Sequence, residues 1–226
     1  MELYVVKLPK NIPKYEYELL LEVISPVQKK KVVSYKYKKD SYRSLLSEIL
    51  VRFLAVQKYK ILNDEIHMQF NPYGKPFIKG NPFYFNTSHS GDWVVVITDN
   101  KEVGIDVEKI QSFDIEIANH FFTSEECSDL NEKVDYNKLI YFYDLWTLKE
   151  CFIKNVGKGL SLPLNSFSVS KHLDSITVKH SFNKDFYFQQ YYLDESYIVS
   201  VCCLHNQFPG SYKTIAYADL IDEFKV

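Results

Sequence analysis

The chain has 226 residues, of which 46% are hydrophobic and 25% charged, ordinary values for a globular protein with an ample core. The formal net charge of -2 argues against a general nucleic-acid binder, which would carry a strong basic excess. No apolar run approaches the roughly 20 residues that cross a bilayer, and the N-terminus lacks the basic region of a signal peptide, so no membrane partner is expected.

The N-terminal part predicts one strand followed by helices. A strand is expected at residues 1–6, followed by a short helix at residues 15–23. Ser25, with a proline directly after it, is typical of an N-cap and opens a second helix. Asp40 is expected to cap a longer helix, because apolar residues recur at helical spacing until about residue 59.

The middle of the chain alternates loop and strand signals. Residues 71–76 are rich in turn formers and predict a loop. Two strands are expected at residues 83–86 and 93–98, on either side of the segment 88–92. A third strand follows at residues 103–108.

The C-terminal part mixes helices and strands in the same way. Residues 115–122 predict a helix, Thr123 begins another, and a longer helix runs through Trp146. Strands are expected at residues 186–192 and 197–204. Strands and helices mixed in each part of the chain, with short hairpins, favour an α+β fold.

The four cysteines show no Cys-x-x-Cys spacing that would indicate a metal site. Cys202 and Cys203 are neighbours on an expected strand and therefore face opposite ways. We interpret the cysteines as reduced, buried thiols of a cytoplasmic protein.

Two distant segments supply three carboxylates and a lysine. Asp106 and Glu108 lie two apart on an expected strand, so they share one face while the apolar residues between them share the other. Glu150 and Lys154 lie four apart on an expected helix and project together. If that helix packs across the strand, Glu150 joins the acidic pair, and oxygen ligands grouped in this way suit Mg²⁺ that bridges substrate phosphates.

Each of these residues also has a plainer interpretation. Glu150 and Lys154 could form only a surface salt bridge, worth about 0.3–0.5 kcal/mol. His89 taken alone is more typical of a turn histidine, and Trp146 of a packing residue. Thr123 and Glu126 have the spacing of a capping box, which we favour for them. The lysine-rich stretch at residues 29–39 is normally a solvated helix face, although here it can also attract an anionic substrate.

Five motifs occur in order along the chain, at residues 73–76, 85–91, 104–108, 122–126 and 146–154. Together they resemble the Sfp-type 4'-phosphopantetheinyl transferases, also called holo-[acyl-carrier-protein] synthases. The likeness covers most of the chain and thins only after about Lys171. Enzymes of this family move the phosphopantetheine arm of coenzyme A onto a serine of an apo carrier protein, either a peptidyl or an acyl carrier, and release adenosine 3',5'-bisphosphate.

The resemblance implies roles for residues near the acidic pair. Asp106, Glu108 and Glu150 would hold Mg²⁺, and either Glu150 or Glu108 would be the base. Lys154 would neutralise charge on the pyrophosphate, and His89 would donate a hydrogen bond to it. The implied contacts to coenzyme A are made by Lys31, Arg43, Ser44, Lys75, Ser88, His89 and Lys154.

The resemblance also implies an architecture and a partner surface. Two pseudo-symmetric halves are expected, with the nucleotide contacts in residues 1–101, the metal ligands and catalytic helix in residues 102–226, and the active site at their junction. Because one chain contains both halves, a monomer is expected. The carrier protein is expected to dock near residues 113–122, where apolar contacts are offered by Ile115, Ile117, Phe121 and Phe122.

Some questions stay open at this stage. Gln28 stands where the family pattern predicts a lysine for the nucleotide phosphates, which puts that contact in doubt. The sequence does not distinguish acceptors of nonribosomal peptide, polyketide or fatty-acid synthesis. Two other functions remain: a different Mg²⁺-dependent phosphate enzyme, of pyrophosphatase or nuclease type, and a non-catalytic relative that binds carrier proteins.

Overall fold

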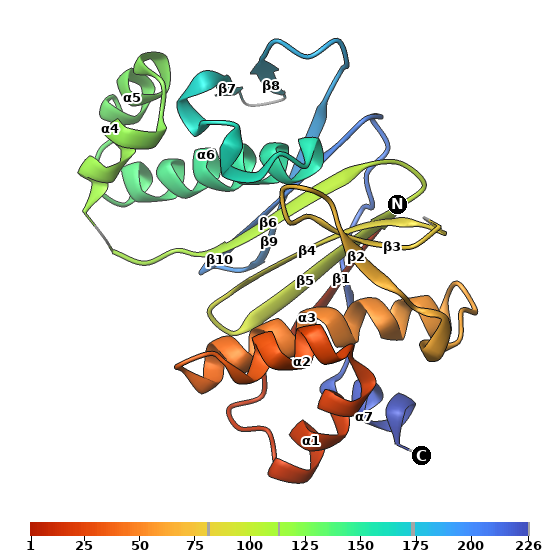
Figure 1. Cartoon of the computed structure of the whole chain (residues 1–226). Coiled ribbons are helices and arrows are strands. Elements are labelled where there is room, and N and C mark those ends of the chain that lie inside the picture. The colour runs from red at the N-terminus through yellow and green to blue at the C-terminus, as the bar shows by residue number, and fades with distance from the viewer. Residues whose placement is uncertain (81, 113, 173–174, 226) are drawn as a thin grey trace.

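The computed structural model describes residues 1–80, 82–112, 114–172 and 175–225. Two sheets of mainly antiparallel strands lie against each other in the middle of the molecule, and helices cover both outer sides (Figure 1). The N-terminal half comprises β1 (Glu2–Lys7), α1 (Lys14–Val23), α2 (Pro26–Val33), α3 (Lys38–Gln57), β2 (Met68–Phe70), β3 (Pro76–Ile78), β4 (Tyr84–Ser90) and β5 (Trp93–Asp99).

The C-terminal half repeats the mixture of strands and helices. It comprises β6 (Val103–Lys109), α4 (Ala118–Phe121), α5 (Ser124–Asn131), α6 (Asp135–Val156), β7 (Ser168–Lys171), β8 (Ile176–Lys179), β9 (Tyr187–Asp194) and β10 (Tyr197–Cys203). Two further elements end the described chain, β11 (Lys213–Thr214) and α7 (Tyr217–Phe224). None of the helices in the described ranges has the length and apolar character that crossing a membrane requires.

The two halves share one topology, which confirms the expected α+β fold of two pseudo-symmetric halves. In the first sheet β1 pairs with β5, which pairs with β4, and both of these pairs are antiparallel. In the second sheet β6 pairs with β10, which pairs with β9, again antiparallel. A long helix packs on the outer face of each sheet, α3 on the first and α6 on the second.

Three apolar clusters hold the layers together. The first fills the space between α3 and the first sheet, and the second lies between α6 and the second sheet. The third lies between the two sheets and contains Val5, Ile97, Ile105 and Val107. Because Ile105 and Val107 point into this inner layer, the alternating residues of β6 point towards α6.

β4 and β6 meet at the junction of the two halves through side chains. The Asn86 side chain accepts a hydrogen bond from the Ile105 backbone N–H at 2.9 Å. Ser90 Oγ accepts one from the Lys109 backbone N–H at 3.1 Å. These two bonds set the register of the strands, which run in the same direction, and so determine which polar residues face each other there.

Two local predictions are corrected by the structure. The segment Ser88–Ser90 was expected to lie between two strands, but it completes β4, where Ser90 pairs with Trp93 of β5. Its two serines hydrogen-bond to residues of β6, and this contact between distant segments could not be read from a polar sequence. Asp40 lies inside the first turn of α3, which has Tyr37 as its N-cap, and accepts a hydrogen bond from Arg43 at 2.6 Å.

Other local predictions are confirmed. Ser25 caps α2 by accepting the backbone N–H of Gln28 at 3.3 Å. Cys202 belongs to the cluster under α6, whereas Cys203 belongs to the cluster between the sheets, so the two neighbours face opposite ways. All four cysteines are free thiols.

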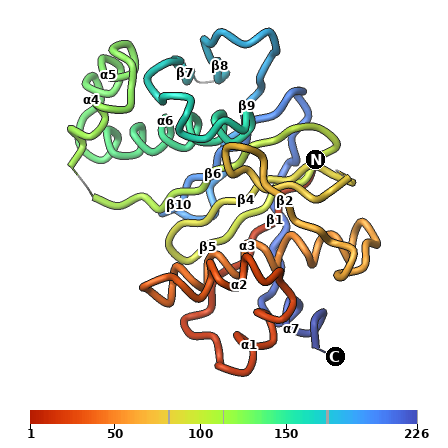
Figure 2. The backbone as a smooth tube through the Cα atoms, viewed as in Figure 1, coloured from red at the N-terminus to blue at the C-terminus, as the bar shows by residue number. Residues whose placement is uncertain are grey.

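The last described elements return to the N-terminal half. β11 pairs in parallel with β1, and α7 packs against α1 and α3. In Figure 2 the blue end of the chain accordingly lies beside the red helices. The proposed boundary near residue 101 stays a prediction, and residues 213–224 lie with the first half in space.

Candidate active site

A cavity of about 490 Å³ opens where the two halves meet. Side chains from α2, α3 and the β2–β3 hairpin line one end of it. The other end is lined by β4, β6 and α6, which contribute Ser88, His89, Asp106, Glu108, Trp146, Glu150 and Lys154. The cavity therefore brings together the three predicted acids, the lysine and the histidine.

Asp106 is the centre of a buried polar cluster at this end. The residue is 3% exposed, and its Oδ1 accepts hydrogen bonds from Ser88 Oγ at 2.8 Å and from Lys154 Nζ at 2.6 Å. Lys154 also lies 3.0 Å from Ser88 Oγ. The sequence left open a surface pair between Glu150 and Lys154, but Lys154 instead forms an ion pair with Asp106 across the junction.

The pKa values of the other two acids, Glu108 and Glu150, are raised beside this cluster. Burial and the charge of Asp106 raise the pKa of Glu108 to about 7, while Ser90 Oγ donates a hydrogen bond to it at 2.7 Å. Burial and Asp106 likewise raise the pKa of Glu150. Because each acid experiences the charge of Asp106, ionising all three together is unfavourable unless a cation joins them.

The side chains of Asp106, Glu108 and Glu150 are of the kind that binds a divalent cation, although they do not converge on one point. Within the described ranges, no three His, Cys, Asp or Glu side chains are placed so that they could hold a metal ion as they stand. Lys154 occupies Oδ1 of Asp106, and Oδ2 is buried without a hydrogen-bond partner among the described residues. An unpaired buried carboxylate oxygen beside two further acids is a donor set suited to Mg²⁺.

Two basic residues complete this end of the cavity. Burial opposes the charge of Lys154, but Asp106, followed by Glu150 and Glu108, outweighs it and raises the pKa of the ammonium. His89 lies on β4 at the cavity wall, where the surrounding protein and the charges of Lys154 and Arg43 lower the pKa of its imidazole. The cavity is thus lined by the ammonium of Lys154, which is ion-paired with Asp106, and by the neutral imidazole of His89.

The predicted nucleotide contacts divide into two groups. Lys31 and Ser44 line the cavity, and so does Gln28. Arg43 does not line it, and instead donates hydrogen bonds to Asp40 and to the Gly91 carbonyl.

Lys75 also lies outside this cavity. It lines a second cavity of about 200 Å³, and its Nζ donates to the carbonyls of Val103 at 3.1 Å and Asn155 at 3.2 Å. Burial lowers the pKa of Lys75 to about 8. Its assignment to coenzyme A stays a prediction.

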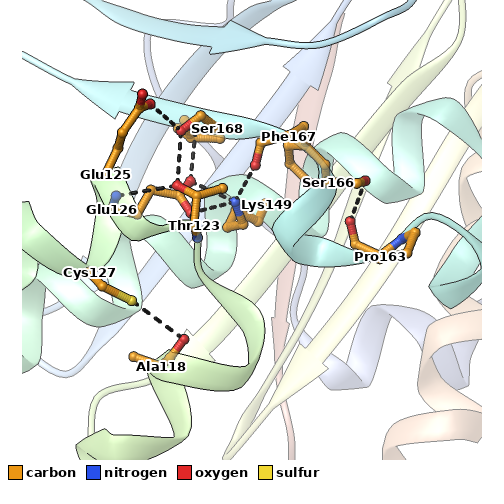
Figure 3. Close-up of polar contacts among 11 residues, drawn as sticks. Ala118, Thr123, Glu125, Glu126, Cys127, Lys149, Pro163, Ser166, Phe167 and Ser168 are labelled. Carbon is orange, nitrogen blue, oxygen red and sulfur yellow. Dashed lines mark hydrogen bonds and ion pairs between the residues drawn. The ribbon is translucent and has the colours of Figure 1, made fainter.

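α6 is tied to α5 by a buried ion pair that sequence reasoning missed. Lys149, which directly precedes Glu150, is 0% exposed and contacts both carboxylate oxygens of Glu126 at 2.6 and 2.7 Å. Lys149 also donates to the Phe167 carbonyl at 2.8 Å (Figure 3). Glu126 forms the predicted capping box with Thr123, so the capping interpretation is confirmed. A buried lysine next to Glu150 in the sequence leaves no periodic signal of its own.

Two further residues were not singled out from the sequence, one beside the acids and one in the cavity wall. Ser90 holds Glu108, and Glu48 lines the cavity on α3. The signal for Glu48 was present, since Ser44, Ser47, Glu48 and Val51 follow helical spacing and all four line the cavity.

The expected docking segment is partly available at the surface. Phe113 lies outside the described residues. Ile117 is 41% exposed, whereas Phe122 is buried and cannot offer a surface contact as it is placed. Phe121 packs edge-on against Trp146 with ring centroids 5.4 Å apart, which confirms a packing role for Trp146, although Trp146 also lines the cavity.

Comparison with known proteins supports one family over the whole chain. Residues 102–202 match the model of the 4'-phosphopantetheinyl transferase superfamily, and residues 12–101 match the model described as 4'-phosphopantetheinyl transferase, N-terminal. The chain is 38% identical over 225 residues to the 4'-phosphopantetheinyl transferase Sfp of Bacillus subtilis, covering 98% of this chain and 100% of that protein.

More distant relatives carry related names. The 4'-phosphopantetheinyl transferase gsp of Aneurinibacillus migulanus is 37% identical, covering 90% of this chain and 86% of that protein. An L-aminoadipate-semialdehyde dehydrogenase-phosphopantetheinyl transferase of Xenopus laevis is 30% identical, covering 69% of this chain and 57% of that protein. The chain belongs to the 4'-phosphopantetheinyl transferase superfamily.

Proposed function

We propose that this protein is a 4'-phosphopantetheinyl transferase that moves the phosphopantetheine arm of coenzyme A onto a serine of an apo carrier protein. The observation that carries the proposal is the cavity between the halves, where Asp106, Glu108 and Glu150 meet Lys154 and His89. Relatives that match almost the whole chain and carry the name of this activity support it.

The reaction exchanges one phosphorus–oxygen bond for another. The serine hydroxyl of the carrier attacks the phosphorus on the pantetheine side of the pyrophosphate, and the bond to the leaving phosphate breaks. Adenosine 3',5'-bisphosphate leaves, and the serine proton passes to a carboxylate of the enzyme. Either Glu108 or Glu150 suits this role, because both carboxylates line the cavity.

Asp106, Glu108 and Glu150 would hold Mg²⁺, which supplies charge neutralisation for the pyrophosphate. Lys154 is already held beside Asp106, where its ammonium stabilises the charge that develops on the leaving phosphate. His89, neutral because its pKa is lowered, donates one N–H to a pyrophosphate oxygen. Ser88 orients Asp106.

The nucleotide of coenzyme A lies at the opposite end of the same cavity, beside α2 and α3. Lys31 and Ser44 are placed there to contact its phosphate and sugar. The lysine-rich surface of α2 and the following loop adds positive charge around this entrance, which favours capture of an anionic substrate.

The carrier protein docks, we propose, on the segment from Ile115 to Phe121. Ile117 offers exposed apolar surface, and the segment leads into Phe121 and Trp146 at the cavity wall. Replacing Ile117 with Asp should raise the KM for the carrier and leave the Kd for coenzyme A unchanged. Equal loss of both would place the carrier elsewhere.

One assay tests the central proposal. The protein is incubated with an apo carrier protein, coenzyme A and Mg²⁺, and the carrier is examined by intact mass for the added arm. Glu150→Gln and EDTA should each abolish the gain, and excess Mg²⁺ should reverse the effect of EDTA. Glu132→Gln, a change of the same kind at the exposed end of α5, should not alter it.

The same experiment separates the alternatives. Breakdown of coenzyme A without a carrier would indicate a pyrophosphatase or nuclease activity. Binding of the carrier without a change in its mass would indicate a non-catalytic relative. The monomeric state is tested separately by the mass of the protein in solution, and the cytoplasmic location and the pathway of the carrier stay predictions.

A further inference from the structure

The loop at residues 71–75 connects β2 to β3 and forms part of the cavity wall. Gly74 lies in this loop and Pro76 follows it, and both line the cavity of about 490 Å³. Among the described strands, β2 and β3 pair only with each other, over three residues each. A hairpin of this size is marginal by itself, so contacts with other elements must hold this part of the wall in place.

Asn71 shapes the loop with one end of its side chain and attaches the loop to α6 with the other. Its Oδ1 accepts the backbone N–H groups of Tyr73 and Lys75, both at 2.9 Å. Its Nδ2 donates to the carbonyl of Gly157 at 2.7 Å, 86 positions further along the chain. An asparagine side chain carries both an acceptor and donors, so one residue performs both tasks.

Lys75 makes a second connection to the same helix end. Its Nζ donates to the carbonyl of Asn155 at 3.2 Å and to that of Val103, the first residue of β6, at 3.1 Å. The last carbonyls of a helix have no partner within the helix and attract positive charge, and α6 ends at Val156. Asn71 and Lys75 therefore supply donors to this helix end from the other half of the molecule.

Gly157 gives these two side chains the room that they need. It follows α6 with a φ of 74°, in the left-handed region that favours glycine at the end of a helix. A Cβ at this position would lie 3.2 Å from Asn71 Nδ2 and 3.3 Å from Lys75 Cδ. The loop is therefore packed closely on the turn that ends α6.

The helix end that receives these bonds is itself fixed, and it leads directly to the site. Asn155 Nδ2 donates to the carbonyls of Glu102 and Cys202 at 3.0 and 2.9 Å, which ties α6 to its own half. Lys154, which lines the cavity, directly precedes Asn155. The bonds of the loop thus set the spacing between the hairpin wall and Lys154.

We infer that Asn71 and Lys75 are positioning residues of the transferase, which fasten the loop at residues 71–75 to the end of α6 and so hold the cavity wall where coenzyme A requires it. The inference rests on the proposed function. Both residues line the second cavity, of about 200 Å³, whereas Gly74 beside them lines the cavity proposed for coenzyme A. Lys75 therefore acts on the substrate through the wall, and not by the direct contact that the resemblance implies.

Asn71→Ser separates the two tasks of the asparagine. The serine hydroxyl can still accept a backbone N–H of the loop, as serine does in turns, but it carries no amide that reaches Gly157. The change alters no charge, so it leaves the attraction between the protein and an anionic ligand as it is. Lys75→Met removes the other two bonds and keeps the apolar stem of the side chain.

The test is a double-mutant cycle on the binding of coenzyme A. Dissociation constants are measured by calorimetry, without Mg²⁺ or carrier protein, for the wild type, the two single variants and the double variant. Each single variant should weaken binding by about tenfold, the scale of one lost hydrogen bond. Because both residues act through one attachment, the double variant should lose clearly less than about a hundredfold. Asn137→Ser, at an exposed position of α6, should bind like the wild type.

A positioning role also predicts which kinetic constants change. With coenzyme A saturating, the kcat of Asn71→Ser should stay within about twofold of wild type, and the KM for the carrier should not change. The reason is that the pairs of Lys154 with Asp106 and of Lys149 with Glu126 keep α6 in place. A general loss of folded protein would instead lower kcat, because the fraction of active enzyme would fall.

Two results would overturn the inference: an Asn71→Ser protein that binds coenzyme A like the wild type, or losses that multiply in the double variant, as a direct contact of Lys75 with the ligand would give. If thermal unfolding shows that Asn71→Ser is not folded, Asn71→Asp replaces it, since it keeps the acceptor of the loop and lacks the donor. Binding by Asn71→Asp equal to that of the wild type would overturn the inference in the same way. A wild type that does not bind coenzyme A at all would instead count against the proposed function.

Discussion

The ammonium of Lys154 lies 2.6 Å from Oδ1 of Asp106, although the two residues are 48 positions apart in the sequence. The contact joins α6 to β6 at the base of the cavity and does not involve Glu150, the neighbour of Lys154 on the same helix face. The packing of a helix on a strand therefore positions this cation in the cavity wall through a contact between distant parts of the chain.

Replacing Lys154 with Met should remove this charge while keeping the apolar part of the side chain. We expect kcat/KM for carrier modification to fall by about 10²–10³, as loss of one charge-stabilising donor does in other active sites. Lys138→Met removes a lysine from the exposed beginning of the same helix and should leave the rate unchanged. Equal activity of both variants would show that the ion pair is only structural.

Replacing Gly104 with Ala should separate α6 from β6. A Cβ at this position would lie 2.0 Å from the Cys151 carbonyl oxygen and 2.4 Å from the Asn155 backbone nitrogen, and backbone cannot move aside cheaply. We expect a loss of about 3 kcal/mol in the free energy of unfolding, measured in urea, together with reduced transfer activity. Gly210→Ala meets no atom within 4 Å and should change neither quantity. A Gly104→Ala protein as stable as wild type would contradict this close packing.

The buried pair of Lys149 and Glu126 should behave as a unit. Removing one member leaves the other charged and buried, so Lys149→Met and Glu126→Gln should each cost about 3–5 kcal/mol of unfolding free energy. The double variant should cost clearly less than the sum of the two. Urea unfolding of the four proteins gives the coupling, and simple additivity would rule out a coupled pair.

Lys75 predicts a dependence of stability on pH. Its pKa is about 8 in the folded protein, against an ordinary value of 10.5, because of burial. Between these two values the unfolded chain holds a proton that the folded chain does not, so stability rises with pH. The difference in unfolding free energy between wild type and Lys75→Met should shift in favour of wild type by about 1.4 kcal/mol for each pH unit above about 8. A constant difference across this range would show that Lys75 titrates normally.

The sequence predicted those parts of the site that depend on local periodicity. Asp106 and Glu108 share a face because side chains alternate along a strand, and β6 realises this pattern. The capping box of Thr123 and Glu126 is likewise local, and it forms as expected. Motifs of this kind need only a few neighbouring residues to be recognised.

Contacts between distant elements could not be predicted in the same way. Ser88 and Ser90 read as loop residues because their hydroxyls are polar, yet β6 supplies Asp106 and Glu108 as partners for them. The sequence left open a salt bridge between Glu150 and Lys154, but Lys154 pairs with Asp106, which only the packing of α6 on β6 brings near. Phe122 was expected at the surface, but its apolar character placed it in the core.

The parallel pairing of β11 with β1 has a consequence for how the molecule is made. β11 lies far along the sequence from β1 and covers one edge of it, so the sheet of the N-terminal half is completed by a segment that follows the C-terminal half. If the two halves were produced as separate chains, the N-terminal fragment would have an uncovered edge at β1. A chaperone, or the separate fragment that contains β11, would have to cover that edge.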